Sequence, residues 1–129
     1  MIALLQRVSH GKVEVDGHTV GEIGHGLVVL LAVEPTDTEA EAERLADRLA
    51  RYRVFEDATG RTNLSVLDTV GSVLLVPQFT LAADTRKGLR PSFTGAASPE
   101  LGRRLFDHAV ASVRRLLGER VATGRFGAH

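Results

Sequence analysis

The sequence predicts an α+β fold in which an antiparallel or mixed β-sheet, or a partial β-barrel, has two helices packed on it. Five or more short segments have the alternating or continuous apolar pattern of strands. Two longer segments place apolar residues at helical spacing. The chain has 129 residues, of which 43% are hydrophobic and 25% charged. This size and composition are typical of one globular domain, which we expect to span residues 1–129.

The first part of the chain is predicted to be β-structure. Residues 2–8 form an apolar opening strand, and residues 12–15 alternate with a period of two. Asp16-Gly17 then predicts a tight hairpin turn, because a primed turn needs positive backbone φ angles, and residues 18–23 form the return strand. The apolar run Leu27–Val33 indicates a strand buried on both faces.

A first helix is predicted from about Asp37 to Arg51. Its start contains two possible capping boxes, Thr36 with Glu39 or Thr38 with Glu41. A short strand at Arg53–Phe55 and a turn-rich loop over residues 56–60 follow.

The second part of the chain begins with a β-rich segment, Ser72–Phe79, and a polar loop. Ser98 and Pro99 then predict the start of a second helix, because Ser is a favoured N-cap and Pro suits the first helical position. Gly118 predicts the end of that helix. A last strand should begin near Arg120.

Several kinds of protein are excluded or disfavoured by the sequence. Cysteine is absent, so disulfides and thiolate chemistry are excluded. The longest apolar run is far shorter than the roughly 20 residues that a membrane span needs. The histidines show no ligand spacing and the glycines form no nucleotide-binding motif, so we expect neither a metal nor a cofactor. We expect no signal peptide before the first strand and expect a cytoplasmic protein.

Charge is unevenly distributed along the chain although the formal net charge is zero. Glu34–Glu43 is acidic without a basic residue, which is typical of a solvated helix start. Basic residues outnumber acidic ones between Arg86 and Arg125. A polyanion such as RNA is therefore expected to approach the second half of the chain.

The segment that follows the second β-rich run is chemically unusual. Pro77, Gln78 and Thr80 together do not suit a buried strand, because Pro donates no ladder bond and a buried Gln needs partners. This pattern favours a role other than filling the core. Alternatively, Pro77 marks an edge or bulge, and Gln78 and Thr80 face solvent.

The ordered motifs of the chain resemble those of the D-aminoacyl-tRNA deacylase family. The resemblance runs from residue 4 to residue 128 and is carried by five segments: Leu4-Leu5-Gln6-Arg7-Val8, Gln78-Phe79-Thr80-Leu81, Ala83-Asp84-Thr85-Arg86-Lys87-Gly88, Arg90-Pro91-Ser92-Phe93 and Thr123-Gly124-Arg125-Phe126-Gly127-Ala128. It implies a cytoplasmic homodimer that hydrolyses, without metal, the ester between a D-amino acid or glycine and the 3′-terminal ribose of tRNA. Glycine mischarged on tRNA(Ala) is such a substrate. The implied role is proofreading of translation, with tRNA and a second copy of the chain as partners, and neither DNA nor a membrane.

The resemblance also implies roles for individual residues. The reacting carbonyl would lie at Gln78, Phe79 and Thr80, where backbone N–H groups and the 2′-hydroxyl of the terminal adenosine do most of the work. Thr80 is expected to position the substrate, and its alternative role is that of a nucleophile. The expected substrate-binding residues are Arg7 at the dimer interface, Pro77, Phe126 and Gly127; the expected tRNA-binding residues are Arg86, Lys87 and Arg90.

Two departures from the family pattern accompany the resemblance. Pro77 stands where the family usually has Ser, and Pro removes one N–H. Family members also continue beyond residue 129 through a Gly-cis-Pro dipeptide that excludes L-amino acids, and this sequence contains no Gly-Pro pair. We therefore expect that the sequence is a truncated or partly ordered product, and the alternative is a divergent member of the family. Two alternative functions are a catalytically weakened module that binds the tRNA acceptor end and a small-molecule-binding barrel.

Overall fold

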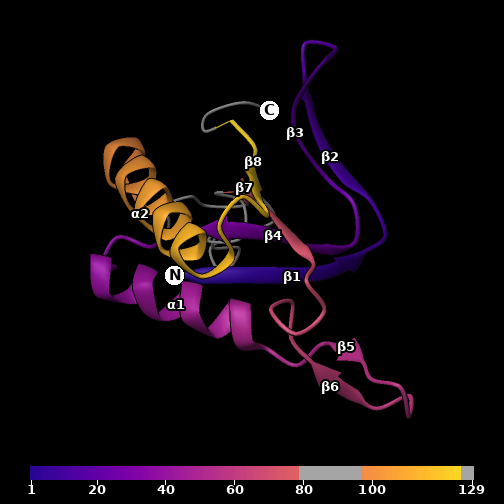
Figure 1. Cartoon of the computed structure of the whole chain (residues 1–129). Helices are drawn as coiled ribbons and strands as arrows, with labels where there is room; N and C mark the ends of the chain where they lie inside the picture. The colour runs from indigo at the N-terminus through magenta and orange to yellow at the C-terminus, as the bar shows by residue number, and fades with distance from the viewer. Residues whose placement is uncertain (79–96, 126–129) are drawn as a thin grey trace, which may run out of the picture.

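The main sheet of the computed structural model, which describes residues 1–78 and 97–125, has four strands in the order β1-β4-β7-β8. Strand β1 is antiparallel to β4, whereas β4, β7 and β8 run parallel to one another. The sheet is therefore mixed, which is one of the forms that the sequence predicted (Figure 1). Its strands are β1 (Ile2–Val8), β4 (Gly26–Ala32), β7 (Ser72–Pro77) and β8 (Val121–Thr123).

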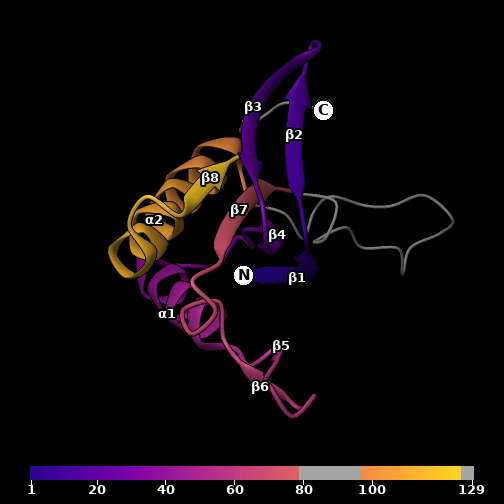
Figure 2. The ribbon, with the colours of Figure 1, turned by 45° about the vertical axis from the view of Figure 1, so that its right-hand side comes forward.

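A hairpin of β2 (Gly11–Val15) and β3 (His18–Ile23) forms where the sequence predicted it. Both turn residues have positive φ, 52° at Asp16 and 79° at Gly17, as the Asp-Gly pair indicated. The hairpin projects from the side of the main sheet that faces away from the helices (Figure 2).

A second hairpin, β5 (Phe55–Glu56) with β6 (Thr62–Leu64), differs from the prediction of a single strand at residues 53–55. The turn is held by the Asp57 carboxylate, which accepts hydrogen bonds from the N–H groups of Thr59 and Arg61 at 2.9 and 3.1 Å. Strand β6 was not predicted because three residues are too few to show a period of two.

The two helices begin and end at residues with recognisable caps. Helix α1 (Glu39–Arg51) starts two residues later than predicted, and of the two possible capping boxes the one between Thr38 and Glu41 forms. Helix α2 (Pro99–Leu117) has Ser98 as its N-cap, accepting from the Leu101 N–H at 3.3 Å, and ends at Gly118 with φ 63°. No helix in the described part of the chain is long and apolar enough to span a bilayer.

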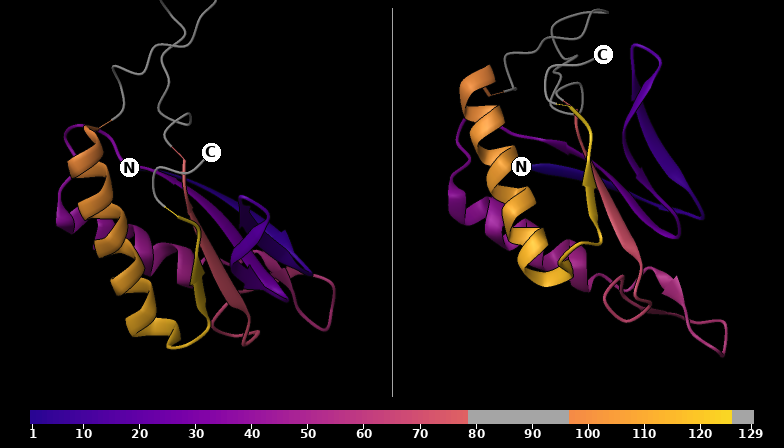
Figure 3. Two further views of the ribbon diagram at one scale, coloured as in Figure 1. Left: turned by 90° about the horizontal axis from the view of Figure 1, so that it is seen from above. Right: turned by 45° about the horizontal axis from the view of Figure 1, so that its top comes forward.

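The hydrophobic core lies between the two helices and one face of the main sheet (Figure 3). Leu27, Val29 and Leu31 of β4 point to this face and are at most 2% exposed. Val28 and Leu30, on the other face of β4, are only half-buried. The prediction that this strand is buried on both faces was therefore wrong for the second face.

The β2–β3 hairpin packs on the second face of the sheet over β7 and β8. This packing depends on Gly21, since a Cβ atom there would lie 2.3 Å from the carbonyl oxygen of Thr123. The same Cβ would be 3.1 Å from Leu74, which is 1% exposed. Backbone of β3 thus lies against backbone of β8 at a distance that only glycine permits.

Candidate active site at the carboxyl ends of the parallel strands

The carboxyl ends of the three parallel strands meet at one edge of the main sheet. Strands β7 and β8 end there at Pro77 and Thr123, and the two predicted site segments, 78–80 and 126–127, follow directly after them in sequence. Parallel sheets commonly bind ligands at this edge, since loops from neighbouring strands converge there. The described ends of β7 and β8, which precede these segments in the sequence, therefore lie at the same edge.

The backbone at the end of β7 is fixed by a hydrogen bond to the neighbouring strand. The N–H of Gln78 donates to the carbonyl oxygen of Leu31 at 2.8 Å. The nitrogen of Pro77 faces the other neighbour, β8, whose pairing with β7 ends at Leu75 and Thr123. Pro77, which has no N–H to donate toward β8, is the last residue of β7, whereas the β-rich segment was predicted to reach Phe79.

The β2–β3 hairpin forms a wall beside this edge. Gly124, the residue after β8, is buried, and a Cβ atom built on it would contact Val76, Val13 and Pro77 at 3.4, 3.5 and 3.6 Å. Val13 belongs to the hairpin, whereas Val76 and Pro77 belong to β7. The site edge is therefore enclosed on one side by apolar side chains from the hairpin and the sheet.

The backbone at the end of β4 holds both residues that flank the segment 79–96. Gln78 bonds to Leu31, and the N–H of Ala97 donates to the carbonyl oxygen of Val33 at 3.0 Å. The positions of Gln78 and Ala97 therefore depend on one stretch of backbone, residues 31–33.

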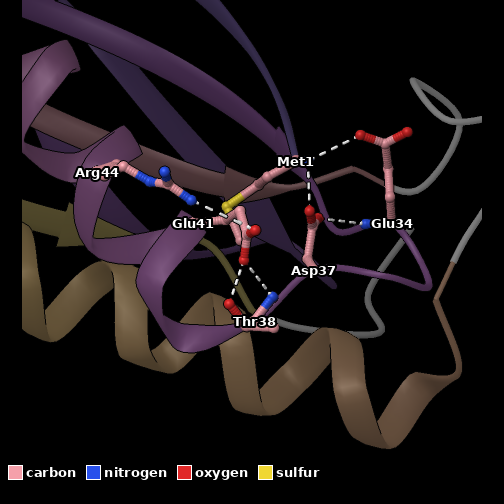
Figure 4. Close-up of polar contacts among 6 residues, drawn as sticks. All are labelled: Met1, Glu34, Asp37, Thr38, Glu41 and Arg44. Carbon is pink, nitrogen blue, oxygen red and sulfur yellow. Dashed lines mark hydrogen bonds and ion pairs between the residues drawn. The ribbon is translucent and has the colours of Figure 1, made fainter.

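The N-terminal ammonium of Met1 braces the residues that follow this stretch (Figure 4). It donates to Glu34 Oε1 at 2.7 Å and to Asp37 Oδ1 at 2.8 Å, while Asp37 Oδ2 accepts from the Glu34 N–H at 2.8 Å. Burial by itself would lower the pKa of this ammonium, but hydrogen bonds to Asp37 and Glu34, together with their charges, raise its pKa above the ordinary value of 8.0. The ion pairs thus keep a partly buried charge in place at the site end of the sheet.

Helix α1 begins immediately after this network. The Glu41 carboxylate accepts from the N–H of Thr38 at 2.6 Å and from its hydroxyl group, and it pairs with Arg44 at 3.4 Å. The Thr38 hydrogen bonds lower the pKa of Glu41. The capping box therefore fixes the turn that carries Asp37 toward Met1.

Sequence reasoning singled out neither Met1 nor Asp37 as a structural partner of this edge. The ion pair between them joins residues 36 positions apart, and the sequence contains no local pattern that reports such a contact. Only the capping box next to Asp37 was visible in the sequence.

The described residues bring Pro77 and Gln78 to the site edge but leave Arg7 away from it. Arg7 is exposed and pairs with Leu27, four residues before Leu31, so it lies about 13 Å further along the strands. The other predicted site residues lie outside the described residues: Phe79, Thr80, Arg86, Lys87, Arg90, Phe126 and Gly127.

Metal-binding chemistry has no candidate in the described ranges. No group of three His, Cys, Asp or Glu side chains within residues 1–78 and 97–125 is arranged to hold an ion. The described residues at the carboxyl ends of β7 and β8 contribute backbone groups and apolar side chains. The two predicted site segments, 78–80 and 126–127, follow these strands in the sequence.

Comparison with known proteins identifies similar sequences. The family model for D-Tyr-tRNA(Tyr) deacylase matches residues 4–129. The chain is 60% identical to the D-aminoacyl-tRNA deacylase of Hahella chejuensis, with 99% of this chain and 87% of that protein covered. It is 63% identical to the protein of the same name from Thioalkalivibrio sulfidiphilus, with 100% and 86% covered.

Two solved structures are similar in fold. One, titled c-Myc DNA Unwinding Element Binding Protein, has a TM-score of 0.93 and 34% identity, and the match covers 98% of this chain and 86% of that one. The other, titled as a probable eukaryotic D-amino acid tRNA deacylase, has a TM-score of 0.87 and 19% identity, with 98% and 89% covered. The second likeness supports the fold alone.

Proposed function

Because the chain belongs to the D-Tyr-tRNA(Tyr) deacylase family, we propose that it hydrolyses the ester bond of D-aminoacyl-tRNA and releases free tRNA and the D-amino acid. One observation carries this proposal: the identity of 60 to 63% with relatives named D-aminoacyl-tRNA deacylase extends over 99 to 100% of this chain. The activity would remove D-amino acids before they enter translation, which makes the protein a proofreading hydrolase.

The reaction needs stabilisation of an oxyanion more than it needs a strong nucleophile. Attack of water on an aminoacyl ester gives a tetrahedral intermediate whose negative oxygen is stabilised by preorganised N–H donors. Pro77 has no N–H, and the N–H of Gln78 is bonded to Leu31. Within the motif, the proposed donors are therefore the backbone N–H groups of Phe79 and Thr80.

The bond between Gln78 and Leu31 has a definite role in this proposal. It fixes the backbone plane immediately before the proposed donors, so they would be preorganised without rearrangement during the reaction. We propose that the Thr80 hydroxyl positions the substrate and that the 2′-hydroxyl of the terminal adenosine assists the reaction.

We propose that two copies of the chain form the working enzyme. Arg7 pairs with Leu27, four residues before the Leu31 that bonds to Gln78, and this separation supports its assignment to the interface. In a homodimer, Arg7 of one copy would act at the interface where the two sites form. Pro77, Phe126 and Gly127 would line the pocket for the amino acid or the terminal adenosine.

The proposed partner in the reaction is tRNA. Arg86, Lys87 and Arg90 follow the reacting segment in sequence and would contact the phosphates of the acceptor end. Aminoacyl-tRNA is consumed by the ribosome, and we place the protein in the cytoplasm for that reason. DNA and membranes have no part in the proposal.

A site built from backbone donors does not read the amino-acid side chain. Glycyl-tRNA, including glycine mischarged on tRNA(Ala), is therefore a further proposed substrate. The alternative of a weakened tRNA-binding module is not favoured, because the similar proteins are named as deacylases.

The proposal is tested by incubating the purified protein with D-aminoacyl-tRNA and measuring the free amino acid released. We expect multiple turnovers, with no change when a chelator is added. The same tRNA carrying the L-amino acid reports on chirality. Release of the D-amino acid at the buffer rate, by a protein that is folded by circular dichroism, would refute the proposal.

A further inference from the structure

Four arginines form two rows on the exposed face of helix α2. An α-helix turns 100° per residue, so positions 11 residues apart lie almost in line. Arg103 therefore aligns with Arg114, and Arg104 with Arg115. Each row is about 16 Å long at a rise of about 1.5 Å per residue. All four side chains are exposed, whereas the opposite face of the helix packs on the core. We call these four residues the α2 arginine face.

The charges of this face are not neutralised by ion pairs. Asp107 lies four residues after Arg103, at the spacing of a helical ion pair, yet none of the four arginines forms one with any residue of the described ranges. Helix α1 differs in this respect, since Arg44 pairs with Glu41 and Arg51 with Asp47. The guanidinium groups of the α2 arginine face are therefore free to bind an external anion.

Stabilisation of the helix explains the presence of only two of these four arginines. Arg114 and Arg115 lie in the last turn, where positive charge interacts favourably with the helix dipole. Arg103 and Arg104 lie in the amino-terminal half, where the dipole provides no such gain. The exposed acids Glu100 and Asp107 lie between the rows, and the four arginines outnumber them.

The α2 arginine face extends from the site edge across the molecule. Ala97, just before α2, bonds to Val33, and Gln78 bonds to Leu31, so α2 begins at the carboxyl ends of the parallel strands. The helix then runs back toward β8, on the outer side of the fold (Figure 3). Arg103 and Arg104 are consequently nearer the site edge, and Arg114 and Arg115 are further from it.

We propose that the α2 arginine face is a docking surface for the phosphate backbone of the substrate's RNA duplex. This inference rests on the proposed function, which places the 3′ end of an RNA at the edge where α2 begins. The duplex that continues from that end needs a basic surface some distance from the reacting ester, and duplex RNA is bound mainly through its backbone and shape. Paired arginine rows provide forked donors for phosphate oxygens.

The test is a variant in which all four arginines are replaced by glutamine: Arg103→Gln, Arg104→Gln, Arg114→Gln and Arg115→Gln. Glutamine has a helix propensity close to that of arginine, so the exposed helix should persist, as circular dichroism will check. Deacylated tRNA is the binding probe. We expect its affinity to fall at least about tenfold, and the log–log salt slope to become shallower by about two to four units.

A matched control removes exposed basic charge elsewhere. Arg48→Gln combined with Arg61→Gln takes one arginine from α1 and one from the loop between β5 and β6. A double variant of α2, Arg103→Gln with Arg104→Gln, gives the same change in net charge as this control. We expect the control to retain the wild-type salt slope and the α2 double variant to lose about one to two units of it.

Hydrolysis of two substrates separates docking from chemistry. On D-aminoacyl-tRNA, we expect the quadruple variant to raise KM with little change in kcat. On a short 3′-terminal fragment that carries the D-amino acid but no duplex, its kcat/KM should equal that of the wild type. Unchanged tRNA affinity and salt slope, or an equal loss on the fragment, would overturn the docking surface. Failure of the wild-type protein to hydrolyse either substrate would instead overturn the proposed function. The affinity for deacylated tRNA and its salt slope would still show whether the α2 arginine face binds RNA.

Discussion

Thr80 supplies a hydroxyl group to the motif that follows β7, and its backbone supplies one of the two proposed oxyanion donors. We predict that Thr80→Ala retains activity within about tenfold of the wild type, whereas Phe79→Pro, which removes an N–H, lowers kcat by about a hundredfold or more. Single-turnover release of the amino acid measures both. A hundredfold loss in a folded Thr80→Ala variant would instead indicate a threonine nucleophile.

The Met1 ammonium makes stability depend on pH in a defined direction. Its pKa is raised in the folded state above 8.0, so its contribution is complete below pH 8 and is lost as the pH rises through the folded pKa. We predict that Asp37→Asn lowers the free energy of unfolding by about 1–3 kcal/mol at neutral pH. We also predict that the variant loses less stability than the wild type above pH 8. Urea unfolding at a series of pH values measures both effects.

The matched control for Asp37 is Asp47, whose carboxylate pairs with Arg51 at 2.8 Å on the surface of α1. Both partners of that pair are more than half exposed, so Asp47→Asn should cost no more than about 0.5 kcal/mol. Equal losses from the two variants, or a parallel pH dependence of Asp37→Asn and wild type, would contradict a structural role for the ammonium.

At the scale of single residues, the sequence indicated which residues are chemically unusual for a strand, but it did not predict contacts between residues far apart in the chain. Pro77 and Gln78 were chosen because their residue types do not suit a buried strand, and Pro77 does end β7. The hydrogen bond from Gln78 to Leu31 was not predictable, because it depends on which strand lies beside β7. The roles of Phe79, Thr80, Phe126 and Gly127 stay predictions.

Among the elements, the β2–β3 hairpin is held against β8 by an approach that only glycine allows. We predict that Gly21→Ala lowers the free energy of unfolding by about 1–3 kcal/mol, because its Cβ would lie 2.3 Å from the Thr123 carbonyl oxygen and the backbones must separate. Thermal unfolding followed by circular dichroism measures the loss. Gly24→Ala is the control, since a Cβ there meets nothing within 4 Å. A Gly21→Ala variant as stable as the control would show that the hairpin is not held this closely.

Elements with strong local signals were predicted well. The Asp16-Gly17 turn, the Thr38 capping box and the Ser98-Pro99 helix start are each determined by residues within a few positions of one another. The β5–β6 hairpin was missed in part because its strands have two and three residues, too few for a hydrophobic period.

For the whole molecule, the position of Arg7 leads to a prediction about assembly. We predict that Arg7→Ala lowers kcat/KM by at least about tenfold in a protein extended to the length of the relatives, the equivalent of one charge-assisted hydrogen bond. The family resemblance implies that Arg7 braces the Gly-Pro element of the partner copy. In the present chain the loss should be smaller, because the sequence contains no Gly-Pro pair. Equal losses in the two proteins would argue against bracing across an interface.

The arrangement of the sheet was beyond sequence reasoning. The patterns predicted the fold class and two packed helices, but the order β1-β4-β7-β8 depends on pairings between strands that are far apart in the chain. Half-burial of the second face of β4 has the same origin, since it depends on where the β2–β3 hairpin lies. The single domain and the homodimer stay predictions.

The strand order also has a consequence for the folding of this chain during its synthesis on the ribosome. Strands β1 and β4 and the first hairpin can pair while synthesis continues, and β7 can then join β4. The other side of β7 stays unpaired until β8 emerges, since Val73 pairs with Val121. Until then, Val73 and Leu75 lack the cover of helix α2 that they have in the core. A nascent chain therefore exposes part of this apolar face until α2 has emerged, and such surfaces aggregate readily. The edge at which β7 and β8 end is therefore complete only after α2 and β8 have emerged from the ribosome.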